Sequence, residues 1–189
     1  MVRDIGKYAS FLRIAGGVTV SGGEPLVQAD FVGALMRQVK AEYGLHVTLD
    51  TNGALAGSVP DAWFDPVDLV LLDIKHGNPD RHHELTATAL QPVLDTARRL
   101  SWMGKPMWLR YVLVPGLTDD YDTVERLADF AAGLGSVERV EVLPFHNMAA
   151  FKWERLAGST YLLADTPAPS PEMEQRVRQQ FARRGLQAA

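Results

Sequence analysis

Short apolar runs, rich in β-branched residues, alternate with helical patterns along this chain. The apolar runs, with their exit turns, cover residues 18–20, 45–53, 67–75, 107–114 and 137–143, and helical spacing of apolar residues fills 29–43, 92–103 and 119–134. Strands joined through helices pair in parallel, because the helix returns the chain to the same end of the sheet. The sequence therefore predicts an α/β protein with a parallel sheet, either a barrel or an open doubly wound sheet.

Further helices are expected outside this alternation. Residues 4–14 have helical spacing, 59–64 suit a short helix or turn, and a last helix begins after Ser170, an N-cap residue followed by Pro171. A polar loop is expected around Gly77. The run 67–75 is apolar nearly throughout, which is typical of a strand buried on both faces.

Composition limits the class of protein. The chain has 189 residues, of which 47% are hydrophobic and 22% charged, so a single globular domain over 1–189 is expected. A net charge of −4 gives no basis for binding nucleic acid. No apolar run approaches the roughly 20 residues that span a bilayer, and the N-terminus lacks a signal-peptide core. We therefore expect a cytoplasmic protein that binds neither nucleic acid nor membranes.

The chain contains no cysteine. This excludes disulfides, thiolate metal sites and a cysteine nucleophile. It also excludes an iron–sulfur cluster held by cysteines of this chain.

Polar or turn-forming residues follow every predicted strand. They occupy 22–24, 50–52, 73–75, 114–116 and 145–146. The carboxyl ends of parallel strands lie on one rim, where α/β folds bind ligands. The sequence therefore places a candidate site on that rim.

The first of these turns has two glycines before a carboxylate. Gly22 and Gly23 lack a Cβ, so their backbone can take positive φ and approach a ligand closely. Glu24 supplies an acceptor for a cationic group. An ordinary glycine turn between a strand and a helix is the alternative interpretation.

Charged side chains fall within two of the predicted strands. Asp73 and Lys75 are two residues apart and therefore point to the same side of the sheet. Lys75 could bind a carboxylate while Asp73 binds a cation or hydroxyl, or the two could form a partly buried ion pair. Arg110 shares a face with Trp108, so it either points inward to support these carboxylates or lies at the sheet edge.

Histidine is the other candidate ligand. His146 lies at the carboxyl end of a predicted strand, whereas His46 lies at the opposite end and is expected to be structural. Adjacent His82 and His83 do not share a face and are not expected to hold a metal. The four tryptophans are expected to be core or packing residues: Trp63, Trp102, Trp108 and Trp153. The arginine pairs Arg98–Arg99 and Arg183–Arg184 are expected to lie on solvated faces.

These motifs together resemble one family. The Gly-Gly-Glu turn, Asp50-Thr51-Asn52, Asp73-Ile74-Lys75, the Arg110 strand with its Pro-Gly exit, and Pro144-Phe145-His146 occur in the order seen in pyruvate formate-lyase activating enzymes, which are radical S-adenosylmethionine (SAM) enzymes. The resemblance continues through Lys152-Trp153 to the final helix. It implies a parallel partial (βα)6-type barrel with about five strands and outer helices, its first βα unit missing.

The resemblance also implies roles for site residues. Gly22, Gly23 and Glu24 would contact the SAM amino group, and Lys75 would lie near its carboxylate. Asp73 and Ile74 would line the same site beside Asn52 and Arg110, and His146 would contact the adenosyl or ribose part. A monovalent cation would be held by Asp50, Thr51 and Asp73.

The family implies a reaction and partners. A reduced four-iron four-sulfur cluster cleaves SAM to a 5'-deoxyadenosyl radical, which abstracts hydrogen from a backbone glycine of a glycyl radical enzyme such as pyruvate formate-lyase. Flavodoxin or ferredoxin supplies the electron. The family's CxxxCxxC loop is absent here, so this chain alone is expected to be inactive, as the truncated C-terminal part of a family member. The strand at 18–20 would then be an open edge, through which the chain is expected to self-associate.

Two other functions remain open at this point. A non-catalytic module could bind SAM or a partner without a cluster. A Schiff-base aldolase could use Lys75 as its nucleophile at a strand end.

Overall fold

Five parallel strands form one sheet. A computed structural model describes residues 1–149 and 163–189, apart from the Ala149 side chain. The strand order follows the sequence: β1 (Val18–Val20), β2 (Val47–Thr51), β3 (Leu69–Asp73), β4 (Met107–Leu113) and β5 (Val137–Pro144). Every neighbouring pair is parallel. The predicted parallel α/β sheet is therefore confirmed, and its strands lie within one or two residues of most predicted bounds.

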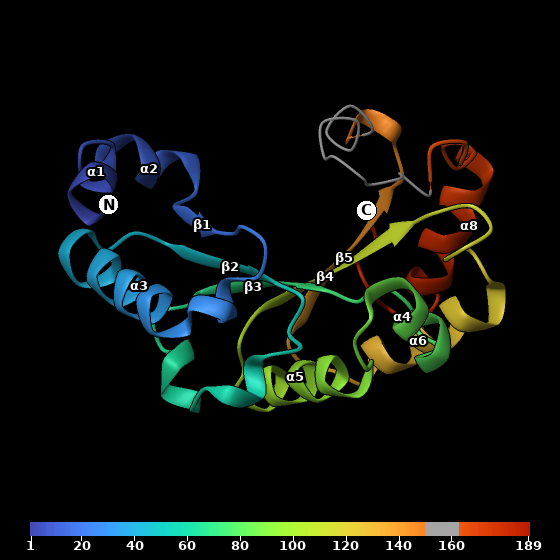
Figure 1. The fold of residues 1–189 in the computed structure, drawn as a ribbon, viewed down its shortest axis with the longest axis horizontal. Coiled ribbons are helices and arrows are strands. Elements are labelled where there is room, and N and C mark those ends of the chain that lie inside the picture. The colour runs from blue at the N-terminus through green and yellow to red at the C-terminus, as the bar shows by residue number, and fades with distance from the viewer. Residues whose placement is uncertain (150–162) are drawn as a thin grey trace.

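Helices cover one face of the sheet. In Figure 1 the sheet curves across the view, with α3 (Ala29–Tyr43), α5 (Gln91–Trp102) and α6 (Tyr121–Ala132) on its convex side and α8 (Pro171–Ala182) beside β5. Residues that face these helices, such as Leu49 and Leu72, are fully buried and form the core. Alternate residues face the concave side, which no helix covers within the described part of the chain. The sheet is thus a partial barrel with an open inner face.

The open inner face corrects one expectation. β3 is buried on only one face, because Val70 and Leu72 are fully buried while Leu69 and Leu71 are half-exposed. A continuous apolar run therefore did not mean burial on both faces here. The half-exposed leucines point into the concave side instead.

Shorter helices complete the fold, and two of them differ from the prediction. The expected helix over 4–14 divides at Lys7 and Tyr8, and the expected polar loop after β3 contains α4, whose N-cap Asn78 accepts hydrogen bonds from two backbone N–H groups. The remaining elements are α1 (Val2–Gly6), α2 (Ala9–Ala15), η1 (Pro25–Gln28), η2 (Ala56–Ser58), η3 (Asp61–Phe64), α4 (Pro79–Thr86) and η4 (Asn147–Ala149).

The last helix begins as predicted, because Ser170 accepts a hydrogen bond from the Met173 N–H. After α8 the chain runs along β5, where Val140 N–H donates to Gln187 O at 2.8 Å. Among the described residues, β1 by contrast pairs only with β2. In that part of the chain, no helix combines the length and the apolar character needed to cross a membrane.

Several side chains expected at solvated faces or in the core lie elsewhere. Arg99 donates to Asp61 and to two backbone carbonyls, and Arg184 donates to Glu125, Asp129 and the Gln180 carbonyl. Both arginines therefore join separate helices, contrary to expectation. Trp102 is 82% exposed, so it is not a packing residue. Trp153 and Lys152 lie outside the described residues.

Asp68 joins α3 to the sheet, and its removal should lower stability in a pH-dependent way. Its carboxylate accepts hydrogen bonds from Lys40 Nζ at 2.6 Å and from the Val47 N–H at 2.7 Å. Burial raises the pKa of Asp68, but these two hydrogen bonds outweigh it and hold the pKa below its ordinary value. The stabilisation is therefore complete above the unfolded pKa of about 3.9 and is lost as the pH falls through the folded pKa.

We expect Asp68→Asn to reduce the free energy of unfolding at neutral pH by about 1–2 kcal/mol. Urea unfolding at a series of pH values checks this, with Asp30→Asn on the exposed face of α3 as the control. The difference from the unmodified protein should shrink below about pH 4. A difference that stays constant down to that pH would contradict the role of the ionised carboxylate.

Candidate functional site

Groups from four strands meet in one cavity of about 290 Å³ at the rim. The turn after β1, the end of β2 and the inward-facing charged side chains of β3 and β4 contribute to it. Its lining residues are Ser21, Gly22, Gly23, Asp50, Thr51, Asn52, Asp73, Lys75 and Arg110. The structure thus brings together residues that the sequence places up to 89 positions apart, counting from Ser21 to Arg110.

The glycine turn leaves one wall of this cavity open to a ligand. Gly22 has a φ of +149°, a value that residues other than glycine rarely adopt. A Cβ added at Gly22 or Gly23 would meet no atom within 4 Å. The space beside this backbone is therefore free for a ligand rather than filled by protein.

Glu24 fastens the turn to the neighbouring strand. Its carboxylate accepts hydrogen bonds from the Leu26 N–H at 3.1 Å, the Thr51 hydroxyl at 2.7 Å and the Asn52 N–H at 2.9 Å. The first of these caps η1, and the other two hold the end of β2. Because Oε2 accepts only one of the three, it keeps capacity for one further donor.

An ionic network lies on the inner face of the sheet. Arg110 donates to Asp50 Oδ1 at 2.8 Å, and its Nε lies 3.8 Å from Asp73 Oδ1. Lys75 Nζ donates to Asp73 Oδ2 at 2.7 Å, and Ser21 donates to Asp50 Oδ2 at 3.1 Å. Arg110 therefore points inward, between the two carboxylates. Of the two positions that the sequence left open, this is the inward one and not the sheet edge.

One oxygen of this network has no partner. Asp73 Oδ1 is buried and accepts no hydrogen bond from the described residues. Leaving a buried carboxylate oxygen unpaired costs free energy, so such an atom is a natural acceptor for a ligand or cation. The Asp73 side chain is 18% exposed, which leaves an approach from the cavity.

Three predicted site residues, Glu24, Ile74 and His146, are not among those that line the cavity. Ile74 is 1% exposed on the helix side of the sheet, so it could reach a ligand only through its backbone. The Thr51 side chain is also buried on that side, where it donates to Glu24. His146 is exposed and does not line the cavity.

The sequence interpretation missed two polar residues near the site. Ser21 follows β1 directly and holds Asp50, which its position before the glycines could have indicated. His76 directly follows Lys75 and is 2% exposed, and its Nδ1 accepts a hydrogen bond from the Asn78 N–H. Burial lowers the pKa of His76. The hydrogen bond that its ring accepts fixes the loop that follows Lys75.

The adjacent histidines of α4 differ in burial, because His83 is exposed whereas His82 is not. His82 is 2% exposed, and its Nδ1 lies 3.1 Å from the Thr88 carbonyl. Among residues 1–149 and 163–189, no group of three or more His, Asp and Glu side chains could together hold a metal ion.

The two cofactors of the resembled family fit this chain differently. A SAM amino acid group needs an acceptor for its ammonium and a donor for its carboxylate. The open backbone at Gly22 and Gly23 and the remaining capacity of Glu24 Oε2 supply acceptors, and Lys75 supplies the donor. A four-iron four-sulfur cluster needs thiolates, and the chain has no cysteine. The residues therefore fit SAM and do not fit the cluster.

Comparison with known proteins agrees with this geometry. Residues 1–131 match the model of the Radical SAM superfamily. The pyruvate formate-lyase-activating enzyme of Staphylococcus epidermidis is 40% identical over 179 residues, which cover 91% of this chain and 70% of the relative. The enzyme of the same name from Staphylococcus aureus is 42% identical with the same coverage.

Solved structures show the same architecture. A domain of pyruvate-formate lyase-activating enzyme from Bacteroides vulgatus superposes with a TM-score of 0.74 and 25% identity, covering 92% of this chain and 98% of that domain. A radical SAM methyltransferase from Sphaerobacter thermophilus superposes with a TM-score of 0.70, and the match covers 100% of this chain and 55% of the methyltransferase chain. At 21% identity, the second likeness shows the fold alone. The chain therefore belongs to the pyruvate formate-lyase-activating enzymes of the radical SAM superfamily.

Proposed function

We propose that this chain forms the SAM-binding part of a glycyl-radical activase that acts on a pyruvate formate-lyase or a related glycyl radical enzyme. The observation that carries the proposal is the identity of 40–42% to enzymes named for this activity. The cavity on the rim supports it, because its residues suit an amino acid ligand.

The proposed roles follow the positions of the side chains. The backbone at Gly22 and Gly23 and the free capacity of Glu24 would receive the SAM amino group, and Lys75 would pair with its carboxylate. Arg110, Asn52 and the Ile74 backbone would line the site, and His146 would reach the adenosyl or ribose part from the rim. SAM supplies a 5'-deoxyadenosyl radical in this family. The thiolates for the cluster would come from outside the 189 residues.

A monovalent cation is a further part of the proposal. Asp73 Oδ1 is the unpaired acceptor for it, and Asp50 and Thr51 line the same cavity. Arg110 already lies between the two carboxylates and competes for the same position. The cation would therefore bind where Arg110 leaves an oxygen unpaired.

Removal of Lys75 tests SAM binding. We expect Lys75→Met to weaken SAM binding by roughly 30-fold, because a charge-assisted hydrogen bond contributes about 1.5–3 kcal/mol. Calorimetry of the chain with SAM measures this. Lys7→Met is the matched control, because Lys7 forms an ion pair of the same 2.7 Å length with Asp4, remote from the site. Equal affinities of both variants would contradict the role of Lys75, and no SAM binding by the unmodified chain would contradict the proposal.

A non-catalytic binding module is the second candidate, and the absence of cysteine favours it. It predicts that the chain binds SAM but forms no 5'-deoxyadenosine under reducing conditions, even when a separate polypeptide supplies the cysteine loop. An aldolase has less support. Lys75 is 37% exposed and paired with Asp73, whereas a nucleophilic lysine needs desolvation or a cationic neighbour.

A glycyl radical enzyme is the substrate, flavodoxin or ferredoxin is the electron donor of the assembled enzyme, and the cytoplasm is the location where both occur. The acidic net charge and the mixed charges of the surface favour protein partners over nucleic acid.

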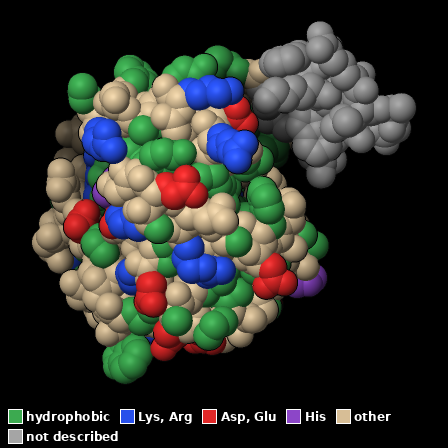
Figure 2. All heavy atoms as spheres, turned by 90° about the vertical axis from the view of Figure 1, so that its left-hand side faces the viewer, with side chains coloured by type: hydrophobic (Ala, Val, Ile, Leu, Met, Phe, Trp, Pro, Cys, Tyr) green, Lys and Arg blue, Asp and Glu red, His purple; other side chains and the backbone are tan. Residues whose placement is uncertain are grey.

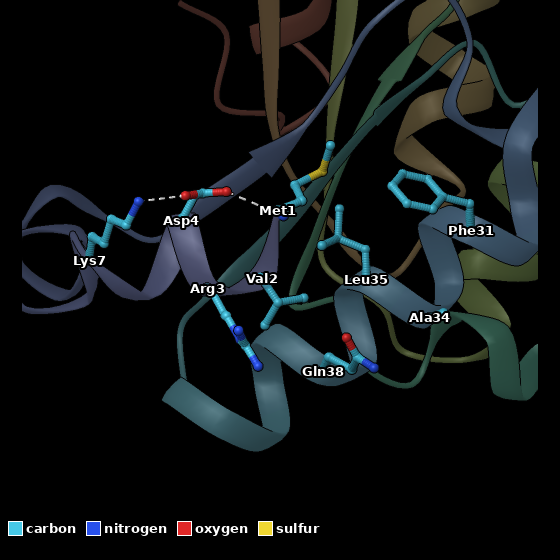
Figure 3. Close-up of a pocket in the computed structure, with 9 residues that line it drawn as sticks. All are labelled: Met1, Val2, Arg3, Asp4, Lys7, Phe31, Ala34, Leu35 and Gln38. Atoms are coloured by element: carbon cyan, nitrogen blue, oxygen red, sulfur yellow. Dashed lines mark hydrogen bonds and ion pairs between the residues drawn. The ribbon is translucent and has the colours of Figure 1, made fainter.

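Self-association would use the β1 side of the molecule. Large exposed hydrophobic side chains gather there: Met1, Tyr8, Phe11, Ile14, Val27 and Phe31. Figure 2 views this side, where hydrophobic side chains reach the surface between charged ones. A groove of about 620 Å³ lies between α1 and α3, and Figure 3 shows Met1, Phe31 and Leu35 around it. β1 adds an unpaired strand edge among the described residues.

Light scattering over a range of concentrations tests this association. We expect a dimer or larger species, and we expect Ile14→Lys to weaken it, because Ile14 is 89% exposed and its replacement leaves the core intact. Trp102→Lys, on the far helix, is the control. A monomer at every concentration would exclude self-association.

A further inference from the structure

Glu141 extends the ionic network of the inner face to β5. Asp73 on β3 pairs in register with Arg110 on β4, and Arg110 pairs in register with Glu141. Val140 and Val142, on either side of Glu141, are buried, so the Glu141 side chain faces the concave side of the sheet, as Arg110 does. Glu141 does not line the cavity, and the SAM site proposed above does not use it.

Among the described residues, Glu141 has one distant cationic partner and accepts no hydrogen bond. Its Oε1 lies 3.9 Å from Arg139 Nε, which is too far for a hydrogen bond. The Arg139 guanidinium lies 5.0 Å from the ring centroid of Trp108, and its Nε is buried without a hydrogen-bond partner in that part of the chain. The Glu141 side chain is 24% exposed, so its carboxylate is poorly solvated and has capacity for a further donor.

Arg110 leans away from this neighbouring carboxylate. Its guanidinium reaches across β3 and donates to Asp50 Oδ1 on β2 at 2.8 Å, and its Nε lies 3.8 Å from Asp73 Oδ1. Adjacent strands are about 4.8 Å apart, and an extended arginine side chain is longer than this, so Glu141 is within its reach on the other side. Arg110 therefore has carboxylates on both sides and contacts those of β2 and β3.

We propose that Glu141 is a positioning residue, which receives Arg110 when a monovalent cation binds between Asp50 and Asp73. The inference rests on the proposed function, of which this cation is a part. A cation at these two carboxylates displaces Arg110, and a guanidinium left without a partner in a poorly solvated position is unfavourable. Glu141 is the replacement partner, one strand away. It lowers the free energy needed to release Arg110 and does not touch the cation.

Potassium titration of the full chain tests this exchange. Thermal unfolding is followed as potassium replaces tetramethylammonium at constant ionic strength, and the rise of the melting temperature with concentration gives the dissociation constant for potassium. We expect Glu141→Gln to raise this constant roughly tenfold, about 1.4 kcal/mol, because Arg110 then moves to a neutral acceptor. Glu141→Asp keeps the charge and should keep most of the affinity.

The Arg110→Met background separates this exchange from a merely structural role. Without a guanidinium to release, Glu141→Gln should change the potassium dissociation constant of Arg110→Met by less than about twofold. Glu174→Gln is the matched control in both backgrounds, because Glu174 is 20% exposed and ion-pairs with Arg178 on α8, outside the cavity. The melting temperature of each variant without potassium measures any loss of stability by itself.

The Arg110 guanidinium reports the exchange directly. Its Nε–H resonance in an NMR spectrum is assigned by its loss in Arg110→Met. We expect this resonance to shift when potassium is added to the unmodified protein and to shift little in Glu141→Gln at the same potassium concentration. A resonance that stays in place in the unmodified protein while potassium binds would overturn the exchange.

The outcomes separate this inference from the proposed function. A loss of potassium affinity confined to proteins that contain Arg110 supports the exchange. An unchanged dissociation constant in Glu141→Gln, or an equal loss with and without Arg110, overturns the exchange while the cation site stands. Potassium binding by Arg110→Met but not by the unmodified protein overturns it too, because Arg110 is then not released. No potassium binding by either protein removes both the cation and the exchange, and calorimetry with SAM tests the rest of the proposed function independently.

Discussion

Glu24→Ala should lower the free energy of unfolding by about 3 kcal/mol and weaken SAM binding by roughly 100-fold. The stability loss arises because three donors lose one acceptor: the Leu26 N–H, the Thr51 hydroxyl and the Asn52 N–H. SAM binding weakens for two reasons. The ligand amino group loses an acceptor, and the turn beside it is less ordered. For a chain of this length, the melting temperature should fall by roughly 10 °C.

Two further variants separate these contributions. Glu24→Gln keeps the side-chain volume and one carbonyl acceptor, so we expect an intermediate loss of stability and most of the loss of affinity. Glu42→Ala, on the exposed face of α3, should change neither quantity. Urea unfolding and calorimetry provide the measurements. A Glu24→Ala protein that keeps full stability would show that the three hydrogen bonds do not hold the turn.

The sequence predicted the fold well because its local signals agreed with one another. The helix over Ala29–Tyr43 and the strand over Val18–Val20 have the predicted bounds, since Gly44 and the glycine turn mark their ends. α4 was missed because its residues are polar and its start depends on the Asn78 cap rather than on an apolar stripe. Burial of β3 was overestimated because periodicity within one strand does not show which layers cover it.

The candidate site was predictable in position but not in detail. A parallel sheet places strand ends on one rim, so the approach of Asp50 and Asp73 followed from topology. The direction of Arg110, which lies within β4, stayed open between the inner face and the sheet edge until the structure showed it pointing inward. The sequence does not show which group each charged side chain pairs with. Glu24 looked like a free acceptor, yet three protein donors occupy it. Arg99 and Arg184 looked solvated because their partners lie far along the chain.

Arg110→Met should destabilise the protein by about 3 kcal/mol, the second large effect expected. Arg110 is the only side chain among the described residues that ion-pairs with both Asp50 and Asp73, whose side chains are 23% and 18% exposed. Removing one partner leaves charges in a poorly solvated position, and this usually costs more than the ion pair itself contributes. The double variant Asp50→Asn with Arg110→Met should recover part of the loss, because it removes one of the two unbalanced carboxylates.

The same variant decides whether a cation can occupy this position. If Asp50 and Asp73 can hold a monovalent cation, potassium should stabilise Arg110→Met well beyond the unmodified protein, because binding to the folded state adds stability with concentration. Tetramethylammonium at equal ionic strength screens charge but is too large for the position, so it provides the control. Thermal unfolding in the two salts measures the difference. Equal stabilisation of Arg110→Met by both salts would show that the carboxylates need Arg110 itself, and the proposed cation would then have no site between them.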